Sequence, residues 1–229
     1  MNPTRFPGGL NTSVVTETTG NLGFPDPTKF HSYFNDFDTY TAGDWVVTET
    51  GVATQVLSDG DGGWLLVTNA AADNDASFSQ LAIESFSLTS GKRAFFKTRF
   101  KTSDVTQSDL QFGLLGVDTT PLDVTDGIYM LKADGAATVD VYCRKDATTG
   151  STSSTAVATL VNDTFVTFGW AYDGVDTVEF FFNDVKVATL DASSTYLPDA
   201  LLTPSFGVQN GEAVAKTMTL DYIFAATER

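Results

Sequence analysis

The stretch TFVTFGWAYDGVDTVEFFFNDVKVATL, residues 164–190, decides the fold class of this chain. Its first part alternates large apolar residues, such as Phe168 and Trp170, with small or polar residues, which is the period of a β-strand with one buried face. The sequences DGVD at 173–176 and ND at 183–184 are turn formers, and an apolar alternation follows each of them. The stretch therefore predicts a three-stranded antiparallel meander.

Short runs of β-branched and aromatic residues recur along the rest of the chain, a spacing typical of an antiparallel sandwich. Both faces of the middle strand of the meander, residues 177–182, are rich in apolar groups. This favours a second sheet on one side and, in one interpretation, a neighbouring chain on the other. The small polar residues of 146–155 predict a mobile hairpin tip. We predict further strands at residues 45–48, 64–68, 78–83, 110–117, 127–133, 138–144, 205–208 and 218–224.

Basic residues cluster around residues 94–101, AFFKTRFK. In a strand, Phe96 and Phe100 share one face and the basic side chains share the other, so the pattern predicts a one-sided antiparallel strand. We interpret the basic face as a solvated surface that acidic neighbours offset, and a contact patch for an acidic partner is the alternative. Five of the 13 basic residues fall within ten positions here: Lys92, Arg93, Lys97, Arg99 and Lys101.

The length of 229 residues suits one large domain, and 42 % hydrophobic residues with 12 % aromatics exclude a disordered chain. No Pro/Gly-rich linker divides residues 33–229, so we predict one sandwich there. Residues 1–32 hold four of the seven prolines and follow no strand or helix period, which predicts an extended N-terminal arm. A disordered leader is the alternative. The arm is favoured by large apolar residues that could anchor it: Phe6, Leu10, Leu22, Phe24 and Phe30.

The charge balance excludes two classes of partner. Thirteen basic residues against 29 acidic ones give a formal net charge of −16, which repels phosphate backbones. We therefore expect neither nucleic acid nor an anionic membrane as a partner. The sequence has no signal-peptide core and no apolar run as long as a membrane span, so we expect a product that starts in the cytoplasm.

Side chains for the common catalytic chemistries are scarce. Cys143 is the one cysteine and His31 the one histidine, which leaves zinc sites and histidine-based acid–base catalysis short of groups. The retaining glucanases of concanavalin-like fold carry a Glu-x-Asp-x-x-Glu run, and this sequence has none, since Glu84 and Glu179 are each followed at the second position by phenylalanine. We therefore predict no catalytic residue, no cofactor and no hydrolase activity.

Acidic residues that suit Ca²⁺ occur at Asp36 and Asp38, which we expect on one face of a strand, and in the loops 59–63 and 73–75. We favour turn and capping roles for them and predict no metal site, because Asp-Gly and Asn-Asp sequences form turns for conformational reasons. A structural Ca²⁺ near Asp36 and Asp221 is the alternative if the first and last strands are neighbours. We assign the three tryptophans to the core, with a sugar-stacking face as the alternative: Trp45, Trp64 and Trp170.

Short segments add a family signal: YFNDFD (33–38), AGDW (42–45), FFKTRFKTSD (95–104), AYDG (171–174), FND (182–184), LTPSFGV (202–208) and LDYI (220–223). In this order they resemble the laminin-G/concanavalin-like jelly-roll proteins. NPTRFP at 2–7 and DPTK at 26–29 look like the arm that precedes this domain in virion structural proteins of tailed bacteriophages.

The resemblance implies an all-β, concanavalin-like jelly-roll sandwich of two antiparallel sheets, preceded by an extended arm. It also implies a non-enzymatic virion protein that decorates or cements the capsid, with the major capsid protein or other virion proteins as partners. A homo-oligomer is expected, with a trimer favoured by analogy. The alternative is a carbohydrate-binding adsorption module of the capsid or tail, with a host glycan as ligand. The residues expected to bind the partner are Arg5, Phe6, Leu10, Leu22 and Phe24.

Overall fold

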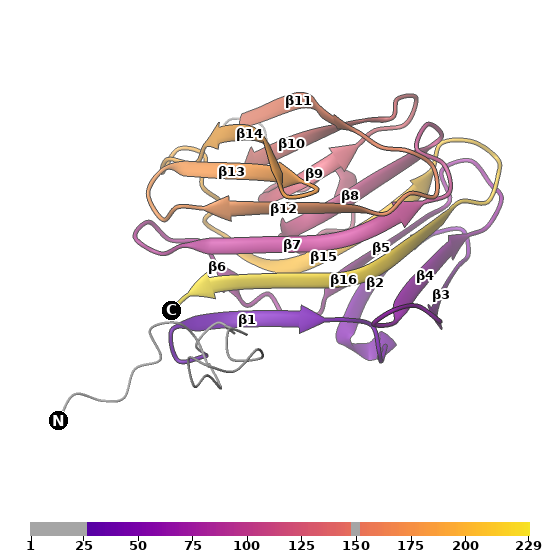
Figure 1. Cartoon of the computed structure of the whole chain (residues 1–229), viewed down its shortest axis with the longest axis horizontal. Coiled ribbons are helices and arrows are strands. Elements are labelled where there is room, and N and C mark those ends of the chain that lie inside the picture. The colour runs from indigo at the N-terminus through magenta and orange to yellow at the C-terminus, as the bar shows by residue number, and fades with distance from the viewer. Residues whose placement is uncertain (1–26, 148–151) are drawn as a thin grey trace, which may run out of the picture.

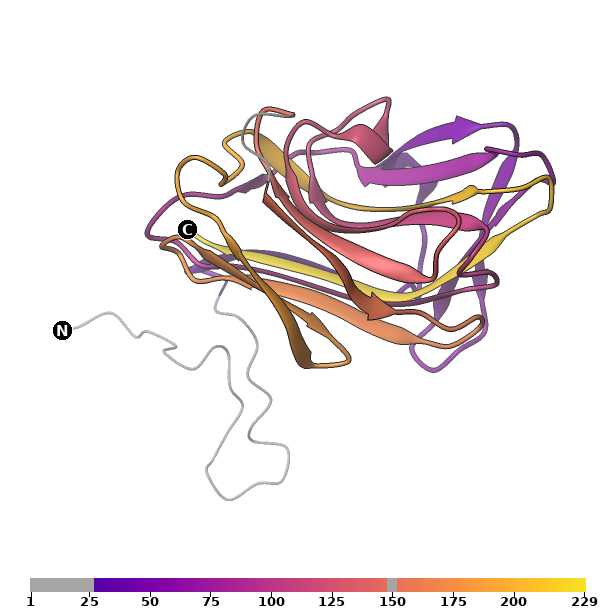
Figure 2. The ribbon, with the colours of Figure 1, turned by 90° about the horizontal axis from the view of Figure 1, so that it is seen from above.

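Two antiparallel β-sheets lie face to face in this chain (Figure 1), and a computed structural model describes residues 27–147 and 152–229. Figure 2 shows the two layers from above. The prediction of an all-β sandwich is confirmed. In the described part of the chain the helices are two short 3₁₀ turns, η1 (Ala42–Asp44) and η2 (Pro121–Asp123), and neither could span a membrane.

We call the two layers sheet I and sheet II. Sheet I contains, in spatial order, β14 (Val185–Asp191), β13 (Thr177–Phe182), β12 (Val166–Tyr172), β7 (Ala94–Thr102), β16 (Thr217–Glu228), β4 (Trp64–Asn69) and β3 (Ala53–Ser58), and β1 (Phe30–Asn35) pairs with the second half of β16. Sheet II contains β11 (Thr152–Thr159), β10 (Thr138–Arg144), β9 (Gly127–Lys132), β8 (Ser108–Leu115), β15 (Leu201–Asn210), β5 (Ala76–Leu81) and β2 (Trp45–Thr50), and β6 (Phe86–Ser87) pairs with β15. The chain crosses repeatedly from one sheet to the other, for example between β7 and β8 and between β15 and β16, which is the connectivity of a jelly roll.

The predicted meander is confirmed as β12, β13 and β14. The turn between β12 and β13 forms because Asp173 Oδ1 accepts hydrogen bonds from the backbone N–H groups of Val175, Asp176 and Thr177. Asn183 and Asp184 both have positive φ, of 48° and 63°, as a two-residue hairpin turn requires. These local bonds explain why the sequence alone was enough to place the three strands.

The core is a layer of aromatic rings between the sheets. Phe100 of sheet I stacks on Phe112 of sheet II with ring centroids 4.0 Å apart. Trp45 and Trp170 are buried, as predicted. Trp64 is not in this core, because Leu65 is the first inward residue of β4 and the alternation turns Trp64 outward, where its ring lies 5.2 Å from that of Phe165.

Several boundaries differ from expectation. The first strand begins at Phe30, where it pairs with Glu228, so residues 30–32 belong to sheet I although the sequence analysis assigned them to the arm. The expected hairpin tip 146–155 includes the start of β11, whose small residues are tolerated at the edge of sheet II. Strand β3 was missed, since it lies at an edge and exposes most of its side chains.

Candidate functional site

The outer face of sheet II carries polar side chains of β8. Because Leu110 and Phe112 of β8 point into the core, Asp109 and Gln111 lie on the outer face. Asp109 Oδ1 accepts a hydrogen bond from the backbone N–H of Asp134 at 2.8 Å. Gln111 is 1 % exposed, and neither polar atom of its side chain has a hydrogen-bond partner. The two side chains are therefore a structurally engaged carboxylate and a buried amide.

The connection from β8 to β9 covers part of this outer face. Its Val124 packs with Leu115 of β8 and Tyr129 of β9 in a small separate cluster. Asp123 lies 2.8 Å from Arg144 of β10 and so ties the connection to the sheet. A hollow of about 250 Å³ remains beside it. Its lining is mostly apolar or hydroxylic and includes Thr48, Phe78, Pro121, Leu122, Asp123 and Gln209.

The basic face of β7 lies on the outer surface of sheet I. Acidic residues of neighbouring strands and turns pair with it, so the interpretation as a surface offset by acidic neighbours is confirmed. Lys101 lies over the rings of Trp64 and Phe165 instead, 5.3 Å and 5.0 Å from their centroids. The ion pairs are Arg93–Glu228 at 2.7 Å, Lys97–Asp184 at 2.6 Å and Arg99–Asp221 at 2.5 Å.

An apolar hollow of about 290 Å³ lies on the same outer face. It is apolar because β13 alternates Phe180 inward with Phe181 outward, and Phe95 and Phe224 join Phe181 in its lining. It is hollow because Gly169 of β12 has no side chain, and a Cβ there would lie 3.0 Å from the carbonyl oxygen of Phe96. The Lys97–Asp184 ion pair also contributes to the lining.

The chain enters sheet I at the same end of the sheet. Arg229 Nε donates hydrogen bonds to the carbonyl oxygens of Pro27 at 3.2 Å and Phe30 at 3.3 Å. On the other side of β16, Phe95 pairs with Ala226, only a few residues from Arg229. The described chain therefore begins beside the strand ends that line the apolar hollow. The residues expected to bind a partner lie outside the described residues: Arg5, Phe6, Leu10, Leu22 and Phe24.

The alternative calcium site at Asp36 and Asp221 required the first and last strands to be neighbours, and β1 and β16 are paired. Asp36 and Asp38 do not share a strand face, however, because β1 ends at Asn35 and Phe37 is buried with a positive φ of 51°. Burial and the nearby Asp221 raise the pKa of Asp36. Asp221 is itself paired with Arg99, so this group already holds a cationic side chain.

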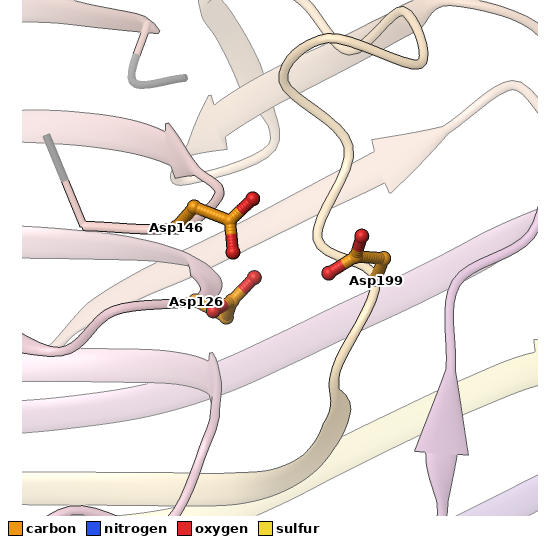
Figure 3. A group of neighbouring side chains, drawn as sticks. All are labelled: Asp126, Asp146 and Asp199. Atoms are coloured by element: carbon orange, nitrogen blue, oxygen red, sulfur yellow. The ribbon is translucent and has the colours of Figure 1, made fainter. Parts of the chain in front are cut away.

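Another acidic group occurs at one end of sheet II (Figure 3). Asp126 precedes β9, Asp146 follows β10 and Asp199 precedes β15. One carboxylate oxygen of each lies within 4.8 Å of the others, and the described residues contain no other cluster of three acidic, histidine or cysteine side chains this close. No motif in the sequence predicts that these three residues form a group. The one available signal was that Asp126 and Asp146 flank the predicted strands 127–133 and 138–144, whose outer ends are neighbours because the two strands pair.

Cys143 and His31, the candidate nucleophile and the candidate base, have different contacts and do not form a pair. Cys143 is buried in the core, as expected for a small apolar residue, and burial raises the pKa of its thiol to about 12. His31 Nε2 lies 2.9 Å from Ser85 Oγ, and its ring packs on Phe86. Burial and Arg229 lower the pKa of His31.

No protein-family model matches the chain, and no curated protein sequence does. Solved structures match it by fold. An endo-1,3-β-glucanase from Streptomyces sioyaensis superposes with a TM-score of 0.65 at 14 % identity, covering 88 % of this chain and 97 % of the glucanase. A protein of unknown function from Shewanella oneidensis MR-1 gives 0.62 at 14 % identity and covers 87 % of each chain. The potassium-bound carbohydrate recognition domain of Emp46p gives 0.55 at 12 % identity, covering 84 % of this chain and 94 % of that domain.

These likenesses show the fold alone, because the identities are low and one fold serves many functions. The prediction of a concanavalin-like jelly roll is confirmed. The similar structures include an enzyme and a carbohydrate-binding domain, so the fold does not choose between those classes.

Proposed function

We propose that this chain is a non-enzymatic structural protein of a virion, which attaches to the major capsid protein or another virion protein through the segment that precedes β1. The observation that carries the proposal is the apolar hollow on sheet I beside the entry of the chain. Phe95, Phe181 and Phe224 line it. Phe34 of β1 is 60 % exposed and pairs across the strands with Phe224 of this lining. Contiguous apolar surface of this kind is typical of protein interfaces.

The outer face of sheet II supports the non-enzymatic part of the proposal. Glycoside hydrolysis needs two carboxyl groups that flank the bond to be cleaved. Asp123 is the carboxylate in the lining of the hollow on that face, and it is held by Arg144. A host-glycan ligand stays an alternative, and it would need polar groups that converge in an open hollow.

The test compares virions grown with the gene for the full chain, for a chain that starts at Pro27, or for the Phe181→Ser variant. Starting at Pro27 keeps β1 and the Arg229 contacts intact, so the sandwich should fold normally. We expect immunoblots and electron cryo-microscopy to detect the full chain in purified virions. We expect the truncated chain to be absent from the particles and the Phe181→Ser variant to occupy them at a reduced level.

The matched control is Val175→Ser, which makes the same kind of apolar-to-polar change at an exposed turn residue of sheet I. It should leave occupancy unchanged. Normal occupancy of the truncated chain would show that the N-terminal segment is not the anchor, and absence of the full chain from virions would contradict the proposal as a whole. Specific binding to a glycan array, with release of reducing ends as the hydrolase readout, would favour the alternatives instead.

A homo-oligomer, with a trimer favoured, belongs to the same proposal. Aromatic residues on the outer face of sheet I, such as Phe95, Phe181 and Phe224, offer a surface that a second copy could cover. Light scattering after size-exclusion chromatography measures the mass directly. A single mass of 24.5 kDa across the working concentration range would contradict the homo-oligomer.

A further inference from the structure

We propose that Asp126, Asp146 and Asp199 form a calcium-binding site at the end of sheet II where β9 begins and β10 ends. Each residue supplies one carboxylate oxygen, and the three oxygens lie within 4.8 Å of one another. Oxygen ligands lie 2.3–2.6 Å from Ca²⁺, so two ligands of the same ion are separated by at most roughly 5 Å. The spacing is therefore that of ligands around one ion. This inference does not depend on the proposed function.

The burial of Asp126 also points to a bound cation. The residue is 5 % exposed, and its Oδ1 is a buried atom with no hydrogen-bond partner. Its carboxylate also accepts hydrogen bonds from Thr125 and from the backbone N–H of Asp146, which orient the group. Figure 3 shows the carboxylate facing the other two. Leaving a buried carboxylate oxygen unpaired is costly, and a cation between the three groups would remove that cost.

The charges around the three carboxylates do not balance without a bound cation. Lys145 Nζ lies 2.8 Å from Asp199 Oδ2 and 3.4 Å from the carbonyl oxygen of Ser194. One ammonium group thus faces three carboxylates, and it contacts Asp199 through a single oxygen.

The donor set favours Ca²⁺ among the common cations. All three ligands are carboxylate oxygens, whereas zinc and copper sites in proteins use histidine or cysteine. Mg²⁺ requires a near-octahedral shell at short distances, whereas Ca²⁺ accepts irregular shells of six to eight oxygens that include water. Two exposed ligands, Asp146 and Asp199, leave space for those waters. A bound ion would join the β8–β9 connection, the end of β10 and the segment before β15.

The experiment uses the full chain after treatment with EDTA and dialysis, titrated with CaCl₂ by calorimetry and by thermal unfolding. The variants are Asp126→Asn and Asp199→Asn, and the second removes an exposed ligand, so its fold is not at risk. Asp163→Asn is the matched control, because Asp163 is an exposed carboxylate before β12 and belongs to none of the acidic groups considered for Ca²⁺. We expect one Ca²⁺ per chain and a higher melting temperature with Ca²⁺ for the unaltered chain and the control. Affinity should fall about tenfold or more in both site variants, and MgCl₂ should bind more weakly.

Three results would overturn the inference. The first is the absence of both binding heat in calorimetry and a rise in melting temperature up to roughly 10 mM CaCl₂. This concentration is above the dissociation constants of weak natural calcium sites. The second is binding that both site variants retain and Asp36→Asn removes, which would place the ion at the acidic group near Asp221. The third is an Asp126→Asn chain that matches the unaltered chain in stability with and without Ca²⁺, which would show that a proton balances Asp126.

Discussion

Lys216 Nζ lies 2.8 Å from Asp104 Oδ2 and joins the loop after β7 to the start of β16. The lysine side chain is 4 % exposed, and a second contact of 2.6 Å to Glu212 Oε1 completes its pairing. Asp104 Oδ1 in turn accepts hydrogen bonds from the backbone N–H groups of Thr106 and Gln107. This network fixes the connection between sheets I and II, because β7 and β8 lie on either side of Asp104.

The first prediction concerns acid stability. Lys216 and two backbone N–H groups lower the pKa of Asp104 to about 2, against burial, which acts in the opposite direction. Because the folded pKa lies below the unfolded value of 3.8, Asp104 contributes stability that is present above pH 3.8 and is lost as the pH falls towards 2. Asp104→Asn should therefore weaken the dependence of unfolding free energy on pH in this window. Urea unfolding between pH 2 and 5 measures it, and identical slopes in the two proteins would refute the assignment.

The second prediction removes the other partner of that pair. Lys216→Met should destabilise the chain at pH 7 by about 2 kcal/mol, because charged hydrogen bonds are lost and Asp104 keeps only its backbone donors. The deficit should shrink near pH 2, where Asp104 is half protonated in the unaltered protein. Lys186→Met is the control, since Lys186 forms an exposed pair with Glu179, and it should cost less than 1 kcal/mol. Equal losses in both variants would contradict a special role for Lys216.

The third prediction concerns alkaline pH. Lys132 is buried on β9 and donates hydrogen bonds to the carbonyl oxygens of Ser108 and Thr106. Burial lowers the pKa of Lys132 to about 8, so between pH 8 and 10.5 the unfolded chain binds more protons than the folded one. This group therefore makes the chain more stable as the pH rises through that window.

Lys132→Met should remove that contribution, because methionine keeps an unbranched stem and does not titrate. The measurement is the difference in unfolding free energy between the two proteins from pH 7 to 10.5, which cancels the tyrosines that titrate in both. The difference should move in favour of the unaltered chain as the pH rises. A constant difference would mean that the pKa of Lys132 is ordinary.

The sequence predicts those strands whose pattern and turns are local. Strand β10 was predicted with the bounds Thr138–Arg144, and the meander was predicted because its turns contain their own hydrogen-bonding residues, such as Asp173. Strand β3 was missed because Val56 and Leu57 are both exposed, so no alternation marks it. Edge strands bury little, and their pattern is correspondingly weak.

The candidate sites depend on non-local pairing, which the sequence does not reveal. Asp199 reaches Asp126 only because β15 pairs with β8, and β8 pairs with β9. The outward position of Trp64 follows from the phase of β4 against β16, and a strand pattern alone does not give that phase. The partner-binding residues Arg5, Phe6, Leu10, Leu22 and Phe24 stay a prediction, since they lie outside the described residues.

The fourth prediction uses Cys143 as a reporter of opening. The thiol is buried on the inner face of β10, and burial raises its pKa to about 12, so it is both inaccessible and protonated at pH 8. Ellman's reagent should label the native chain slowly and the urea-unfolded chain at once. Because this is the one cysteine of the chain, the signal has a single source. Complete labelling of the folded chain within minutes would show that this part of the core opens readily.

The fifth prediction tests the aromatic core that the meander builds against β7. Trp170 stacks on Phe96 with centroids 6.2 Å apart and pairs across the sheet with Phe180, which is fully buried. Trp170→Ala or Phe180→Ala should cost about 3–5 kcal/mol, because each loses buried apolar surface and leaves a cavity that the surrounding core fills only in part. Val175→Ala, at an exposed turn residue, should change stability by less than about 0.5 kcal/mol. Urea unfolding measures all three, and a core variant as stable as the turn variant would mean that the two sheets do not depend on this contact.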